Sequence, residues 1–235
     1  MKTSAVLPQT FQNASEEHAY QAVKATFGQQ FPEHHLLTNV ILRTGEMGGP
    51  KTSEYDLIFV CSAGVIVFEV KGWSNAFLTS QKAADGQHGW VLQKLGGEHI
   101  QVRDPVAQGG FKVRYLLEHL KGIFCTQYVL FTEPSLTLDQ GCNAHTIQLS
   151  DLPYLSRITR ATARKYREQH LLDEEKVSAV AAALLEAAHP NTSAQHLRNV
   201  LAWADQKAAV AAQGERTDLT QPSSGASQSQ DGAPL

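Results

Sequence analysis

The segment from Glu54 to Trp73, EYDLIFVCSAGVIVFEVKGW, constrains the fold of this chain more than any other stretch. Two runs of β-branched and aromatic residues flank a short turn, which is the pattern of a β-hairpin. Because strand side chains alternate, the hairpin has two distinct faces. One predicted face is apolar throughout and is therefore expected to lie on the core: Tyr55, Leu57, Phe59, Ile66, Phe68 and Val70.

The other predicted face is apolar near the turn and charged at the open end, where it carries Glu54, Asp56, Glu69 and Lys71. If the loop consists of two residues, Cys61 pairs with Gly64 and Asp56 lies opposite Glu69, with their Cβ atoms ~5 Å apart. A three-residue loop would change this pairing.

Two facing carboxylates repel each other unless a cation lies between them, and Mg²⁺ prefers oxygen ligands of this kind. Lys71 follows on the same face and could orient a water molecule or stabilise negative charge. An exposed hairpin end with cross-strand ion pairs, including one between Glu54 and Lys71, explains the pattern equally well.

The order of elements along the chain predicts an α/β fold. A helix with Ser15 as N-cap and Ala19, Val23 and Phe27 on one face precedes three strands. A second helix begins at Pro105, and one or two strands follow it. This order favours a mixed sheet covered by helices. The remainder is predicted to form helices at Asp151–His170, Asp173–His189 and Ser193–Gln213, followed by a disordered tail from Gly214.

Composition excludes several classes of protein. With 42% hydrophobic and 18% charged residues, the 235-residue chain is typical of a globular protein. A net charge of −3 gives no overall electrostatic basis for binding nucleic acid or membranes. Three cysteines without a CxxC pair predict reduced thiols. No apolar run suits a signal peptide or a membrane span, so we expect a soluble, cytoplasmic protein.

Four motifs together resemble a known family. SEEHAYQAV opens the first helix, EYDLIFV and EVK form the hairpin ends, and DPVAQ opens the second helix. This set resembles the nuclease-related domain, or NERD domain, a branch of the restriction-endonuclease-like PD-(D/E)xK superfamily. The resemblance covers Ala14 to Phe131, and it departs from the family pattern at Asp104, where an asparagine is usual. The expected division of the chain is a short N-terminal segment over residues 1–13, a nuclease-like core over 14–150, a helical extension over 151–213 that the resemblance does not cover, and the tail over 214–235.

The resemblance also implies functional roles. Asp56 and Glu69, with the Val70 carbonyl as a further ligand, would bind Mg²⁺ or Mn²⁺, and Lys71 would be the catalytic lysine. Glu16 is preferred over Glu17 as the helix glutamate because it shares the apolar stripe, although it could simply stabilise the helix N-terminus. Gln108 would line the cleft or be an ordinary surface glutamine.

The implied activity is metal-dependent hydrolysis of DNA, with RNA as another possible substrate, and the alternative is a silent module that binds nucleic acid or protein. A basic stripe on the helix after residue 151 could follow a phosphate backbone or be a solvated face. It consists of Arg157, Arg160, Arg164 and Arg167. Lys112, Arg114 and Lys121 are weaker candidates for phosphate contacts. The sequence does not predict an oligomeric state.

Overall fold

The computed structural model describes residues 11–44, 50–82, 88–142, 144–167, 171–189 and 193–218. The strands are β1 (His34–Arg43), β2 (Thr52–Cys61), β3 (Gly64–Lys71), β4 (Ala76–Lys82), β5 (His88–Lys94), β6 (His99–Val102), β7 (Cys125–Phe131), β8 (Leu136–Leu138) and β9 (Thr146–Gln148). The helices are α1 (Ala14–Gln30), α2 (Pro105–His119), α3 (Leu152–Arg167), α4 (Glu174–Glu186) and α5 (Ser193–Asp218), with a 3₁₀ turn at Leu149–Asp151.

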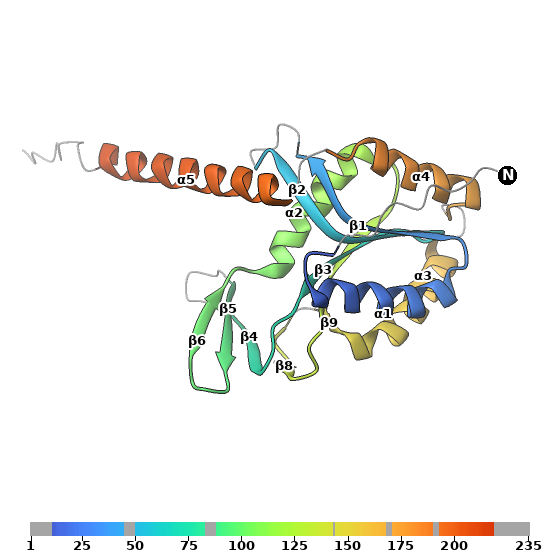
Figure 1. Ribbon diagram of the computed structural model, residues 1–235, viewed down its shortest axis with the longest axis horizontal. Helices are drawn as coiled ribbons and strands as arrows, with labels where there is room; N and C mark the ends of the chain where they lie inside the picture. Colours follow the sequence, from blue (N-terminus) through green and yellow to red (C-terminus); the bar gives the residue numbers. More distant parts are fainter. Residues whose placement is uncertain are drawn as a thin grey trace, which may run out of the picture.

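A five-stranded mixed sheet in the order β1-β2-β3-β7-β9 forms the centre of the molecule (Figure 1). The β1-β2-β3 meander is antiparallel, whereas β7 and β9 run parallel to β3. The predicted mixed sheet flanked by helices, of the restriction-endonuclease-like kind, is confirmed. A second sheet in the order β6-β5-β4-β8 projects beyond the end of β3, where the sequence indicated only short β segments.

The hairpin turn has the predicted two-residue loop, because Cys61 pairs with Gly64. Gly64 has φ of 114°, a conformation that favours glycine. A Cβ atom at this position would lie 2.3 Å from the carbonyl oxygen of Phe124, which precedes β7. Glycine is therefore required both by the turn and by the close approach of β7 to β3.

Two apolar layers cover the central sheet on opposite faces. On the α1 and α3 side, the hairpin contributes Leu57, Phe59, Cys61, Ile66, Phe68 and Val70. On the α2 and α4 side it contributes Tyr55, Ile58, Val60, Val65 and Val67. The aromatic rings of Phe59 and Phe68 pack edge-on against Phe27 of α1, so this helix is anchored directly on the hairpin.

Tyr55 lies on the opposite face from the one predicted. The strand alternation breaks between Tyr55 and Ile58, which both belong to the α2 side. The break falls at Asp56, which lies between the Thr38–Leu57 and Val40–Tyr55 pairs, opposite Asn39 of β1. Asn39 has a positive φ of 50°, which turns the backbone locally. The change of face directs the Tyr55 hydroxyl to the carbonyl of Lys112, to which it donates a hydrogen bond of 2.7 Å.

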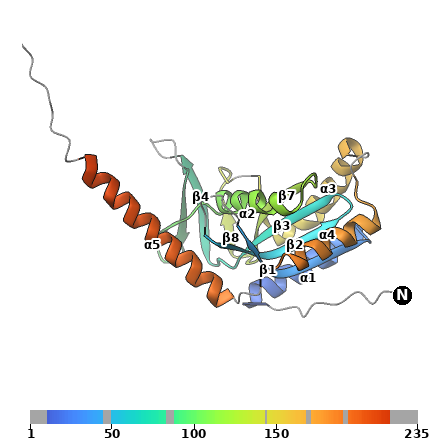
Figure 2. The ribbon, with the colours of Figure 1, turned by 90° about the horizontal axis from the view of Figure 1, so that it is seen from above.

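The C-terminal helices have different relations to the sheet. Leu152 and Ala163 of α3 belong to the α1 side, and Val177, Val180 and Leu184 of α4 belong to the α2 side. Helix α5 begins beside β2 and then projects away from the body (Figures 1 and 2). It extends to Asp218, past the end predicted from the sequence, and the rest of the predicted tail lies outside the described residues. Across the described ranges, no helix is long and apolar enough to cross a membrane.

Candidate active site

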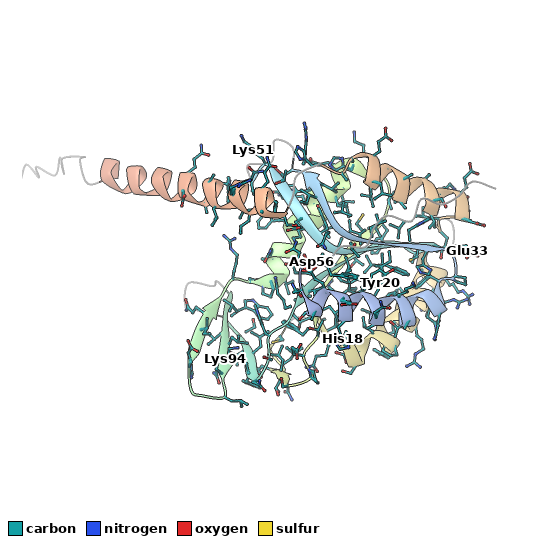
Figure 3. The ribbon with its side chains drawn as sticks, viewed as in Figure 1. His18, Tyr20, Glu33, Lys51, Asp56 and Lys94 are labelled. Atoms are coloured by element: carbon teal, nitrogen blue, oxygen red, sulfur yellow. The ribbon has the colours of Figure 1, made fainter. Side chains whose placement is uncertain are left out.

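Asp56 and Glu69 lie where β2 and β3 separate. The ladder between these strands ends at the Leu57–Phe68 pair, while β3 continues alongside β7 to Lys71. Beyond the last pair, the Val70 amide donates its hydrogen bond to a side chain instead of a backbone carbonyl of β2. The acceptor is Oδ2 of Asp56, at 2.7 Å. Figure 3 labels Asp56 at this point, beside the N-terminal end of α1. The register thus brings the two acids together, as predicted.

The Glu69 carboxylate is bound by two lysines. Its Oε1 accepts a 2.7 Å hydrogen bond from Lys71 Nζ, and its Oε2 accepts one from Lys112 Nζ. Lys112 Nζ also lies 3.9 Å from Oδ1 of Asp56. Glu69 is 3% exposed and Lys112 is 8% exposed. The open end of the hairpin is therefore not the exposed end that the alternative interpretation predicted. Lys71 forms its ion pair with Glu69 rather than with Glu54.

The cluster perturbs the pKa values of its members. Burial, reinforced by Glu69 and partly opposed by Lys112, raises the pKa of Asp56 to about 6. Burial would also raise the pKa of Glu69, but the ammonium groups of Lys112 and Lys71 outweigh it and lower that pKa to about 2. For Lys112, burial acts to lower the pKa, and the two carboxylates more than reverse this effect. The two carboxylates thus face two lysine side chains, and the formal charges of these four groups balance.

Lys112 is the site residue that sequence reasoning missed, since it ranked only as a weak candidate for a phosphate contact. In α2 it belongs to the buried face with Tyr115 and Leu116, whereas Arg114 and Lys121 are exposed. A lysine on an apolar helical stripe needs a buried counter-charge, because an unpaired buried ammonium is costly. The helical spacing of Lys112 with Tyr115 and Leu116 therefore already indicated a buried lysine in the sequence.

Glu16 is buried near the site but does not contact the other acids directly. Its carboxylate accepts hydrogen bonds from the Gln12 amide at 2.8 Å, from Asn13 Nδ2 at 2.9 Å and from Asn39 Nδ2 at 3.4 Å. Asn39 lies opposite Asp56 in the pairing of β1 with β2, so Glu16 is hydrogen-bonded to a residue next to the site. Glu17, by contrast, is exposed.

The N-cap of α1 is Asn13, not Ser15 as predicted. The Asn13 side chain accepts a 3.0 Å hydrogen bond from the Glu16 amide, and Ser15 lies within the helix. A Cβ atom on Gly72 would lie 2.2 Å from Ser15 Oγ. The first turn of α1 therefore lies against Gly72, the residue that follows the end of β3.

A cavity of about 430 Å³ adjoins the carboxylate cluster. Lys112 forms part of its wall together with half-buried Gln108 and exposed Phe111 of α2, and α5 supplies Val200 and Trp203. Side-chain hydrogen bonds hold α5 against β2. His196 Nδ1 lies 2.8 Å from Thr52 Oγ1, Asn199 Nδ2 donates a 3.4 Å hydrogen bond to the same oxygen, and Ser193 Oγ donates a 2.5 Å hydrogen bond to Glu54. Gln108 thus lines a cavity beside the cluster, and α5 contributes to its wall.

The arginine stripe of α3 lies away from this cluster. Arg160 Nη1 is 3.5 Å from Oε1 of Gln30, the last residue of α1. At 1.5 Å per residue, the C-terminal end of α1 is ~20 Å from Glu16. Arg157 and Arg164 are exposed, and the Arg167 side chain lies outside the described part of the structure.

The donor atoms of the cluster suit a divalent cation in type, because the buried Glu69 and the partly buried Asp56 offer carboxylate oxygens to a single position. Lys112 shows that one cation can serve both acids, and its ammonium group is the cation at that position. Within the described residues, no three His, Cys, Asp or Glu side chains are grouped to hold a metal ion. A metal at this site would therefore rest on two side chains and would have to displace Lys112.

The family model of the nuclease-related domain matches residues 12–132, just over half of the chain. No curated protein and no solved structure matches the chain significantly. The matched segment includes the cluster of Asp56, Glu69, Lys71 and Lys112, and it agrees with the segment on which the resemblance was based. The chain therefore belongs to the nuclease-related domain family.

Proposed function

We propose that the protein is a metal-dependent nuclease that hydrolyses phosphodiester bonds in DNA, with Asp56 and Glu69 as the ligands of Mg²⁺ or Mn²⁺. The observation that carries this proposal is the pair of carboxylates, Glu69 buried and Asp56 partly buried, that share one cation position in a chain of this family. Without a cation between them, the two carboxylates would repel each other and destabilise the sheet at this point.

Each residue of the cluster has a distinct task in this proposal. When bound, the metal ion would polarise the scissile phosphate and lower the pKa of a water molecule. The Val70 amide orients Asp56, and the Val70 carbonyl is a further candidate ligand. Lys71, whose side chain is 21% exposed, reaches solvent while Glu69 holds it, so it can orient the attacking water or stabilise the charge that develops on phosphate. Glu16 acts as a positioning residue through Asn39.

The surroundings of the cluster offer two surfaces to a nucleic acid. The lining of the cavity includes Gln108, Phe111 and Arg103, so it combines hydrogen-bonding, stacking and cationic groups. The arginines of α3 would contact phosphates farther along the strand. At ~3.4 Å per base pair, ~20 Å corresponds to about six base pairs, so only a longer duplex would reach both surfaces.

A catalytically silent binding module is the second candidate, and one specific observation favours it. Lys112 already neutralises the two acids, so their retention does not by itself require a metal. In this alternative the cluster is a structural ion-pair network, and the cavity and basic groups bind a partner without hydrolysis.

Cleavage of supercoiled plasmid in Mg²⁺ or Mn²⁺ tests between these functions. We expect nicking that EDTA and Glu69→Gln both abolish, whereas Glu17→Gln, which removes an exposed acid from the neighbouring helix, leaves it unchanged. Cleavage that survives Glu69→Gln would place the activity outside this site. Metal-independent binding of labelled DNA without cleavage would establish the silent module, and the same assay on labelled RNA separates the two nucleic acids.

A further inference from the structure

Lys112 occupies the position between Asp56 and Glu69 that a divalent cation would take. Its Nζ donates a hydrogen bond to Glu69 Oε2 and lies 3.9 Å from Asp56 Oδ1. The remaining Glu69 oxygen is bound by Lys71, and the remaining Asp56 oxygen by the Val70 amide. All four carboxylate oxygens thus have a cation or a donor beside them in this arrangement of the chain.

Charge and space forbid a metal ion and this ammonium group at the same position. The two carboxylates and the two lysines balance, and a divalent ion added to that set would face uncompensated repulsion from both ammonium groups. Lys71 is partly exposed and can be solvated where it stands, but Lys112 is buried between the acids. Lys112 is therefore the group that has to leave.

The cavity beside the cluster supplies the room for that movement. It has a volume of about 430 Å³, and Lys112 is part of its wall. The lining of the cavity also includes Ser53, Thr52 and His196, whose oxygen and nitrogen atoms can accept a hydrogen bond from an ammonium group, although Thr52 Oγ1 and His196 Nδ1 already lie 2.8 Å apart. A lysine has four rotatable side-chain bonds, so its Nζ can swing from the acids into this space while α2 stays in place.

We propose that Lys112 is a resident counter-ion that competes with the divalent metal, and that metal binding drives its ammonium group into the adjoining cavity. The exchange replaces one cation by another and involves no proton transfer. This inference rests on the proposed function, because it assumes that the metal ion binds at Asp56 and Glu69. The displaced ammonium then lies in the cavity that also carries Arg103 and Gln108, where it adds positive charge next to the position proposed for substrate phosphate.

Direct metal binding tests the proposal without reference to cleavage. Mn²⁺ affinity is measured by calorimetry on the full chain, for the wild type, Lys112→Met and Lys112→Gln. Lys176→Met is the matched control, because it removes the lysine of an exposed ion pair with Asp173 on α4. We expect both Lys112 variants to bind Mn²⁺ at least tenfold more tightly than the wild type and Lys176→Met, and the gain to disappear when Glu69→Gln is added.

A second measurement follows Lys112 itself in the wild type. Its buried amine should react slowly with an acylating reagent, and saturating Mn²⁺ should accelerate that reaction severalfold, as read by peptide mass spectrometry. Equal Mn²⁺ affinity in the wild type and in either folded Lys112 variant would overturn the proposal. So would a Lys112 labelling rate that does not change when metal demonstrably binds.

The failures of the two proposals are distinguishable. A Lys112 variant that binds Mn²⁺ tightly at Glu69, in a protein that never cleaves nucleic acid, would support the counter-ion role and refute the nuclease. A wild-type protein that cleaves with metal while Lys112 stays protected would refute the counter-ion role and leave the nuclease standing.

Discussion

Glu69→Gln should be among the most destabilising single changes in this protein. The substitution removes the hydrogen-bonded counter-charge of Lys112 and leaves its ammonium 8% exposed, with only the Asp56 carboxylate 3.9 Å away. Removal of one partner of a buried ion pair costs about 3–5 kcal/mol, because the other charge remains buried without compensation. Against a total stability of roughly 5–15 kcal/mol, this is a large fraction.

The size of the effect can be measured by urea unfolding in EDTA, with circular dichroism and tryptophan fluorescence as probes. With an m value of about 2 kcal/mol/M, a loss of about 3 kcal/mol shifts the midpoint by about 1.5 M. The second substitution Lys112→Met should restore part of that loss, because it removes the stranded ammonium. A double-mutant cycle should therefore give a coupling energy of about 2 kcal/mol between these two residues.

Lys176→Met serves as the control, since its ion pair with Asp173 lies in solvent and the unfolding midpoint should stay unchanged. A Glu69→Gln protein that unfolds within about 0.5 kcal/mol of the wild type would refute the reasoning, because it would show that Lys112 is solvated once its partner is lost. The same conclusion would follow if the two substitutions were simply additive.

Three further outcomes are expected. The folded protein raises the pKa of Asp56 from 3.8 to about 6, so it binds this proton more tightly than the unfolded chain does. The stability of the wild type relative to Asp56→Asn should therefore fall by about 2 kcal/mol as the pH rises from 4 to 7, measured by urea unfolding at several pH values. Gly109→Ala places a Cβ atom 1.3 Å from Gln127 Oε1, so thermal unfolding should show a free energy of unfolding lower by about 1–3 kcal/mol. In Gly110→Ala the new Cβ atom has no close neighbour, so this substitution should stabilise α2 by up to about 1 kcal/mol. Burial raises the pKa of the Cys61 thiol to about 12, so iodoacetamide at pH 8 should alkylate it only after unfolding, as read by peptide mass spectrometry.

Local features of the chain were open to prediction from the sequence. The hairpin register follows from a two-residue loop and from alternating apolar residues, and it brings Asp56 and Glu69 together without reference to the rest of the fold. The start of α2 at Pro105 with Asp104 as its cap depends on the same short-range chemistry, since the Asp104 side chain accepts hydrogen bonds from the first turn.

Features that depend on the docking of distant segments could not be predicted from the sequence. Lys112 is 43 residues from Glu69 along the chain, and only the packing of α2 over the sheet brings its ammonium group between the acids. The change of face at Tyr55 depends on the positive φ of Asn39 in the neighbouring strand.

The sequence by itself thus determined that two carboxylates and Lys71 meet at one end of a hairpin, because register and alternation are short-range properties. Only the tertiary structure decided that Lys112 neutralises them and that α5 closes a cavity beside them. Those contacts join elements whose relative positions are set by the two apolar layers of the whole sheet.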